Sequence, residues 1–170
     1  EALWGEQHSL ETLLSIKDNN PIVFDSLYQQ NPTPKEGLLL SHDELNYFNM
    51  NDLQAEPDGI ISVVDIADEG TDDLSQPIAY LYGKDVYVVD VMFTKEPIQI
   101  TQPRSAEMLD RYRVQKARYE SNNGGKGYAQ KVKDLKRGKT VVDWKHTTTN
   151  KHTKIIMASG IIKQNFYFRK

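Results

Sequence analysis

A chain of 170 residues is long enough for one domain with a hydrophobic core, and its content of 38% hydrophobic and 26% charged residues is ordinary for a globular protein. No apolar run is long enough to cross a membrane, the N-terminus lacks the pattern of a secretory signal, and the absence of cysteine excludes disulfides and cysteine-bound zinc. The net charge of −3 excludes a protein whose whole surface attracts nucleic acid. We therefore expect a cytoplasmic protein without membrane contact.

The charges are distributed unevenly along the chain. The segment 43–73 is rich in acidic residues and contains no Lys or Arg. From Lys126 to Lys170 basic residues predominate, and the only acidic residues are Asp134 and Asp143. This division favours a cation site in one half and a phosphate-binding surface in the other, unless the two are unrelated solvated surfaces.

The first third of the sequence predicts helices and irregular chain. Ser9 is a suitable N-cap for a helix with an apolar face, and Pro21 suits the first position of a second helix. The residues Asn31-Pro32-Thr33-Pro34 would end that second helix, because proline disfavours helical backbone in the residue before it.

From Asp58 onward the pattern changes to strands and helices. Short β-branched runs predict strands, and apolar residues at helical spacing predict helices. The strands are expected at 60–66, 78–82, 86–93, 118–120 and 139–145, and the helices at 105–116, at 127–137 and from 149 or 150 through 162. This β-β-β-α-β-α-β-α order, with a hairpin turn at Gly83-Lys84-Asp85, predicts an α/β fold with a mixed central sheet and helices on both faces, preceded by a short helical lead-in.

Two carboxylates stand at the ends of predicted strands. Asp65 lies at the end of the first strand and Glu120 at the end of the fourth. The functional crevice of open α/β sheets forms at the carboxyl ends of strands, so these carboxylates would meet there if their strands are parallel neighbours. Two close carboxylates repel each other unless they share a proton or bind a cation, and Mg²⁺ and Mn²⁺ prefer such oxygen ligands. Individually, Asp65 would also suit a cap or turn, and Glu120 the support of a loop.

Several motifs resemble those of the large terminase subunits of tailed phages, and they cover nearly the whole chain in the expected order. The first three look like the segment that joins the ATPase and nuclease domains of that family, the next three are similar to its two acidic motifs, and the last is similar to a late basic element. In order they are Ala2-Leu3-Trp4, Tyr28-Gln29-Gln30-Asn31-Pro32, Glu36-Gly37, Val64-Asp65-Ile66-Ala67, Gly70-Thr71-Asp72, Glu120-Ser121-Asn122-Asn123-Gly124-Gly125-Lys126-Gly127, and Asn150-Lys151 with Lys154-Ile155.

The resemblance implies an RNase H-like nuclease domain that depends on Mg²⁺ or Mn²⁺, with two metal ions in the complete site. Asp65 would be the metal ligand of the first strand and Glu120 the second acid, and both would be catalytic. Asp68 and Asp72 would assist in metal binding, or else be solvated acids of a loop. The residues expected to contact DNA are Asn122, Asn123, Gly124, Gly125, Lys126, Lys151 and Lys154. A tight turn and an exposed helix face would explain the same residues without DNA.

The sequence departs from the family pattern in two places. The family has a further Asp late in the domain, whereas the segment 155–170 contains no acid. Lys154 stands where the family has Arg, and lysine cannot bind a phosphate through two parallel hydrogen bonds. No Gly-x-x-x-x-Gly-Lys-Ser/Thr loop occurs, so ATP hydrolysis is not expected of this chain. We expect residues 1–57 to be a linker from the ATPase side and 58–170 a nuclease domain that stops short of its C-terminal end.

The function implied by the resemblance is cleavage of concatemeric double-stranded DNA during phage or prophage genome packaging in the host cytoplasm. The implied partners are double-stranded DNA, the terminase ATPase domain, the portal protein and the small terminase subunit. One alternative is a catalytically incomplete DNA-binding or docking module of the packaging motor, which the missing late acid favours. Another is a different RNase H-like nuclease or resolvase, against which the N-terminal motifs argue.

Overall fold

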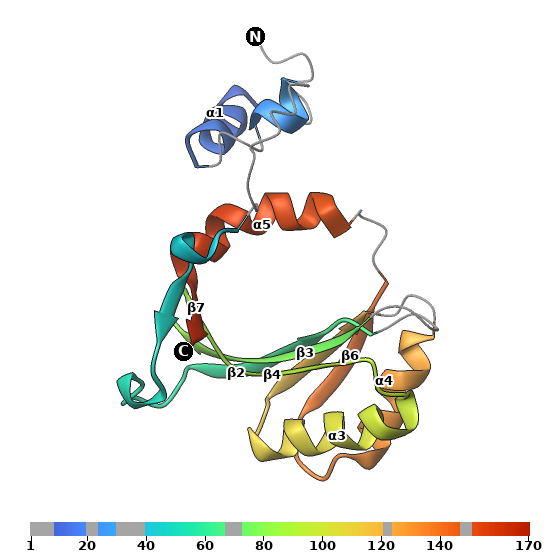
Figure 1. Cartoon of the computed structure of the whole chain (residues 1–170). Helices are drawn as coiled ribbons and strands as arrows, with labels where there is room; N and C mark the ends of the chain where they lie inside the picture. The colour runs from blue at the N-terminus through green and yellow to red at the C-terminus, as the bar shows by residue number, and fades with distance from the viewer. Residues whose placement is uncertain (1–8, 20–23, 30–39, 67–72, 121–123, 147–150) are drawn as a thin grey trace. The chain divides into compact units, whose positions relative to one another are not determined.

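The computed structural model describes residues 9–19, 24–29, 40–66, 73–120, 124–146 and 151–170. The chain divides into two compact units (Figure 1). Glu1–Leu45 and Thr149–Gln164 form the first, which we call the helical unit, and Asn46–Thr148 and Asn165–Lys170 form the second, which we call the sheet unit. None of the helices in the described residues is long and apolar enough to cross a membrane. The boundary expected at residue 57 stays a prediction.

The helical unit contains α1 (Leu10–Asn19), the single π-helical turn η1 (Phe24–Tyr28), the 3₁₀ turn η2 (His42–Glu44) and nearly all of α5 (Lys151–Asn165). The predicted N-cap is confirmed, because the Ser9 hydroxyl accepts a hydrogen bond from the Thr12 N–H at 3.2 Å. The start expected for the second helix, at Pro21, lies outside the described residues.

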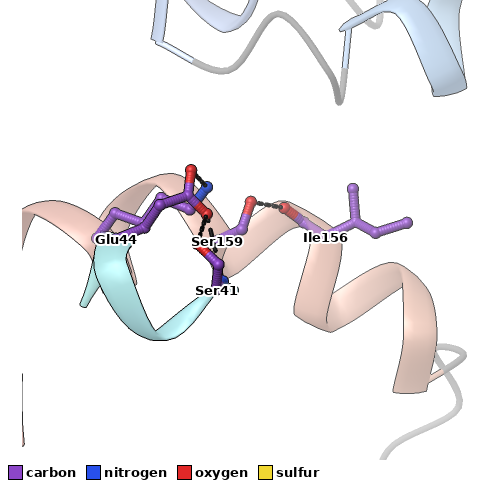
Figure 2. A network of polar contacts seen from close by, with 5 residues as sticks. Ser41, Glu44, Ile156 and Ser159 are labelled. Atoms are coloured by element: carbon purple, nitrogen blue, oxygen red, sulfur yellow. Dashed lines mark hydrogen bonds and ion pairs between the residues drawn. The ribbon is translucent and has the colours of Figure 1, made fainter. Parts of the chain in front are cut away.

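Glu44 joins η2 to α5 within the helical unit. Its carboxylate accepts hydrogen bonds from Lys163 Nζ at 2.6 Å and from the Ser41 hydroxyl at 3.1 Å. These hydrogen bonds, that from Lys163 first, lower the pKa of Glu44 from 4.5 to about 2. Figure 2 shows this contact and, beside it, the Ser159 hydroxyl that donates to the carbonyl of Ile156 at 2.7 Å within α5.

The sheet unit is built on a seven-stranded mixed sheet with the order β1-β7-β4-β3-β2-β5-β6. Strand β3 runs antiparallel to its two neighbours, β2 and β4, whereas β2, β5 and β6 run parallel, as do β4, β7 and β1. Their bounds are β1 (Asn46–Phe48), β2 (Gly59–Val64), β3 (Leu74–Tyr82), β4 (Asp85–Thr94), β5 (Lys116–Glu120), β6 (Val141–Lys145) and β7 (Phe166–Arg169). The predicted α/β class with a mixed central sheet is confirmed.

The two helices of the sheet unit, α3 (Ile98–Arg111) and α4 (Gly125–Leu135), differ in their bounds from the predicted ones. Helix α3 begins before the expected Ser105 because it tolerates Pro103 in its interior, which the sequence pattern treats as a boundary. It ends before the expected Lys116 because Arg113 adopts left-handed backbone with φ of 51°. Helix α4 begins two positions before Gly127 and ends at Leu135 rather than Arg137.

Both α3 and α4 pack against the same face of the sheet (Figure 1). Between them and the sheet lies a core whose large members are fully buried. They include Leu74, Ile78, Leu109, Tyr119 and Val132. We call the other side of the sheet, turned away from α3 and α4, the open face; it leaves Val63 58% and Phe93 66% exposed.

Candidate metal and DNA-binding site

Asp65 and Glu120 lie side by side at the carboxyl ends of two parallel strands. The register of β2 against β5 pairs Ile61 with Lys116 and Val64 with Tyr119, so the next position places Asp65 opposite Glu120. Neighbouring strands are roughly 5 Å apart, which brings the two carboxylates within reach of one ion. The condition set by the sequence analysis, that the first and fourth predicted strands are parallel neighbours, is therefore met by β2 and β5.

Both carboxylates project from the open face. Val64 and Tyr119, which precede them, are 1% and 0% exposed and belong to the core beneath α3 and α4. Side chains alternate along a strand, so Asp65 and Glu120 point the opposite way, and both are half-buried. Asp65 keeps the strand geometry because its N–H and C=O both bond to Ser75 of β3, each at 2.9 Å.

A tight turn holds the end of β5 against the start of α4. Gly124 has φ of 91°, a left-handed backbone that favours glycine. Gly125 is buried against the main chain of Glu120, where a Cβ would overlap the carbonyl oxygen and lie 3.3 Å from Cδ1 of Ile66. These two glycines therefore have structural roles in the turn, which the sequence offered as an alternative to DNA contact.

The remaining predicted site residues are placed in part. Asp68, Asp72, Asn122 and Asn123 lie outside the described residues. Lys126 is exposed in the first turn of α4, with its Nζ 5.7 Å from the centre of the Trp144 ring. Lys151 and Lys154 are on α5, in the helical unit, where Lys154 is half-buried. Of the residues predicted to hold a metal, the structure brings together Asp65 and Glu120.

The donor set of the described residues suits one hard cation. In those residues no group of three or more His, Asp or Glu side chains is close enough to hold a metal ion. Two carboxylates with retained waters are a usual set for Mg²⁺. Asp143 projects from the same open face, on β6, but Arg118 and Lys116 bind its carboxylate. The Arg118 guanidinium keeps the pKa of Asp143 below its usual range.

The sequence reasoning missed Lys145, which ends β6 directly opposite Glu120 in the parallel register. Its side chain is exposed. The alternation of the segment 141–145 carried a usable signal, since Val142 is buried and Lys145 must then project from the open face with Asp143. An acid therefore follows β2 directly, an acid ends β5, and a base ends β6, the third of these neighbouring strands.

The fold is that of the nuclease domains of large terminase subunits. The large terminase of the thermophilic bacteriophage D6E, in complex with ADP, aligns with 97% of this chain at a TM-score of 0.63 and 6% sequence identity. The nuclease domain of the P22 large terminase aligns with 80% of this chain and 74% of its own, at a TM-score of 0.54 and 9% identity. No protein-family model matches the chain, and no curated protein matches its sequence.

These similarities confirm the predicted RNase H-like fold class. At such low identities they show the fold alone. The chain spans 42% of the length of the D6E large terminase chain.

Proposed function

We propose that this chain is the metal-dependent DNA-cutting part of a phage or prophage large terminase, which cleaves concatemeric double-stranded DNA during genome packaging. The observation that carries the proposal is the register that sets Asp65 beside Glu120 at the ends of two parallel strands. The fold shared with terminase nuclease domains supports it. The ATPase domain, the portal protein and the small terminase subunit would be its partners in the packaging motor.

In this proposal Asp65 and Glu120 hold Mg²⁺ or Mn²⁺ through their carboxylate oxygens. A bound ion of this kind supplies a polarised phosphodiester and a water of lowered pKa. The chain itself fixes the two carboxylates before substrate arrives, through the paired hydrogen bonds between Asp65 and Ser75 and through the packing of Gly125 on Glu120. Asp68 and Asp72 are the acids that the sequence offers for a second ion.

The DNA would approach the carboxyl ends of β2, β5 and β6. Lys126 and Lys145 stand at that edge, in the first turn of α4 and at the end of β6, and cations there attract phosphates. Asn122, Asn123, Lys151 and Lys154 are further proposed contacts from the sequence.

Plasmid cleavage in the presence of Mn²⁺ tests the assignment. We expect Asp65→Asn and Glu120→Gln each to reduce cutting by roughly 100-fold or more, since even changes beyond the direct ligands cost 10–100-fold. Asp134→Asn, an exposed acid on α4, is the matched control and should cut like the wild type. Thermal unfolding of each variant checks that it is folded. Wild-type rates in both Asp65→Asn and Glu120→Gln would refute the site.

A second candidate function is a DNA-binding or docking module that does not cut. It is favoured by the absence, among the described residues, of a third acid beside Asp65 and Glu120. A chain that binds duplex DNA but leaves plasmid intact with Mg²⁺ and with Mn²⁺ would establish this alternative.

A further inference from the structure

Charged residues at every second position of β5 form a row along its open face, two cations followed by Glu120 of the acidic pair. Lys116, Arg118 and Glu120 share this face, because Ala117 and Tyr119 between them are buried in the core. Residues on one face of a strand repeat at roughly 6.7 Å, about the axial rise of two base pairs along DNA. A DNA strand that passes Glu120 along β5 would therefore carry every second phosphate over Arg118 and then Lys116.

Both cations of the row are bound to one carboxylate of the neighbouring strand. Asp143 of β6 lies opposite Arg118 in the register. Arg118 donates from Nε to Oδ1 at 3.0 Å and from Nη2 to Oδ2 at 2.9 Å, and Lys116 Nζ lies 3.4 Å from Oδ2. The two parallel hydrogen bonds give the fork geometry in which arginine binds carboxylates and phosphates alike.

The contact is accessible and exchangeable. The side chains of Arg118, Asp143 and Lys116 are 44%, 33% and 51% exposed. Ion pairs at such exposure contribute little to stability, so a competing anion can replace the carboxylate at small cost. A phosphodiester carries the same single negative charge and offers two oxygens to the same fork.

We propose that Arg118 and Lys116 bind the phosphate backbone of duplex DNA, and that Asp143 occupies them in the DNA-free protein as an internal substitute for a phosphate. The proposal rests on the proposed function in taking duplex DNA as the ligand. Binding of DNA breaks the contacts to Asp143 and leaves that carboxylate beside the phosphates, so Asp143 weakens DNA binding.

The chain offers a matched ion pair for comparison. Arg111 donates from Nη2 to Oε1 of Glu107 at 2.9 Å, within one turn of α3. This pair has the same charges and is more exposed, but it lies on α3 rather than on the open face of the sheet. Glu107→Gln and Arg111→Gln therefore change the net charge as Asp143→Asn and Arg118→Gln do, without touching the proposed DNA track, by which we mean Lys116 and Arg118 with their partner Asp143.

The test is fluorescence anisotropy of a labelled duplex of about 20 base pairs, with EDTA present so that no cleavage occurs. We expect Asp143→Asn to tighten binding roughly fivefold, and Arg118→Gln to weaken it roughly tenfold and lower the slope of log K against log salt by about one. In the double variant the gain from Asp143→Asn should be smaller than in the wild-type background, because only the share that acts through Lys116 remains. Arg118→Lys should be intermediate, since it keeps the charge without the fork.

Two results would overturn the inference. One is a change in duplex affinity that is no larger in Asp143→Asn than in Glu107→Gln, or no larger in Arg118→Gln than in Arg111→Gln. Undetectable duplex binding by all variants counts as this result. The other is displacement of Asp143 by inorganic phosphate alone, seen as a shift of the Arg118 Nε–H NMR signal, without any change in duplex affinity in the variants. That outcome would indicate a site for free phosphate.

The outcome is separable from that of the proposed function. Cleavage that depends on Asp65 and Glu120, with no coupling between Arg118 and Asp143, would leave the nuclease assignment intact and remove the track. Coupling in DNA binding without any cleavage would do the reverse.

Discussion

Replacing Gly125 with alanine probes the turn on which the position of Glu120 depends. A Cβ at Gly125 would overlap the carbonyl oxygen of Glu120, lie 3.0 Å from its carbonyl carbon and lie 3.3 Å from Cδ1 of Ile66. Two of these three atoms are main chain, so no side-chain rotation relieves the overlap. The end of β5 or the start of α4 has to move.

The expected magnitude follows from two opposing effects. Overpacking a well-filled site costs about 1–3 kcal/mol, and alanine in place of glycine in a helix returns about 0.5–1 kcal/mol. Gly125→Ala should therefore destabilise the sheet unit by roughly 1–2 kcal/mol. Gly127→Ala is the control in the same turn of α4, because nothing lies within 4 Å of a Cβ there, and it should stabilise by about 0.4–1 kcal/mol.

Urea unfolding followed by circular dichroism measures both changes, and Mn²⁺ titration of the folded variants measures the consequence for the site. We expect Gly125→Ala to bind Mn²⁺ more weakly than the wild type, since the displaced backbone carries Glu120, and Gly127→Ala to bind it unchanged. Equal stability of the two variants would refute the reasoning from backbone contact.

Two further predictions concern contacts away from the site. The Glu44 carboxyl should titrate by NMR with a pKa near 2, and its pKa should return toward 4.5 in Lys163→Met. Because the pKa is lower in the folded protein, the stabilising contact is complete above pH 4.5 and is lost as the pH falls toward 2. A titration midpoint near 4.5 in the wild type would contradict this prediction. Asp110 accepts two backbone N–H groups of the connection between α4 and β6, both at 2.8 Å, so Asp110→Ala should lower the free energy of unfolding by about 1–3 kcal/mol in urea and Asp110→Asn by less. Unfolding of Asp110→Ala at the wild-type urea concentration would show that this connection needs no acceptor.

The pairing of Asp65 with Glu120 could be predicted because it depends on local patterns and one topological rule. The β-branched run 60–66 marks the end of one strand, and the Ser-Asn-Asn-Gly-Gly loop after the short segment 118–120 marks the end of the other. Functional groups gather where parallel strands end, so only the adjacency of the two strands remained to be assumed. The structure supplies that adjacency through the register of β2 and β5.

Other features could not be predicted because they arise from long-range register or from tolerated exceptions. Arg118 and Asp143 are 25 positions apart and meet only because β5 and β6 pair in one particular register. Strand β1 has three residues, too few for a periodic signal. Helix α3 starts before Pro103, although proline in a helix interior usually marks a boundary.

The register of β5 is the common requirement of the metal site and of the proposed DNA track. A shift by one residue would turn Arg118 and Glu120 into the core and expose their neighbours. Tyr119 opposes such a shift, because it is fully buried and its hydroxyl shares a 2.7 Å hydrogen bond with the Ser105 hydroxyl of α3. Moving it out would leave a cavity and an unpaired buried hydroxyl, which together cost several kcal/mol, about 3–5 for the aromatic ring alone. The core side of β5 thus fixes which charges the open face presents, and with them both the acid that ends the strand and the arginine that precedes it.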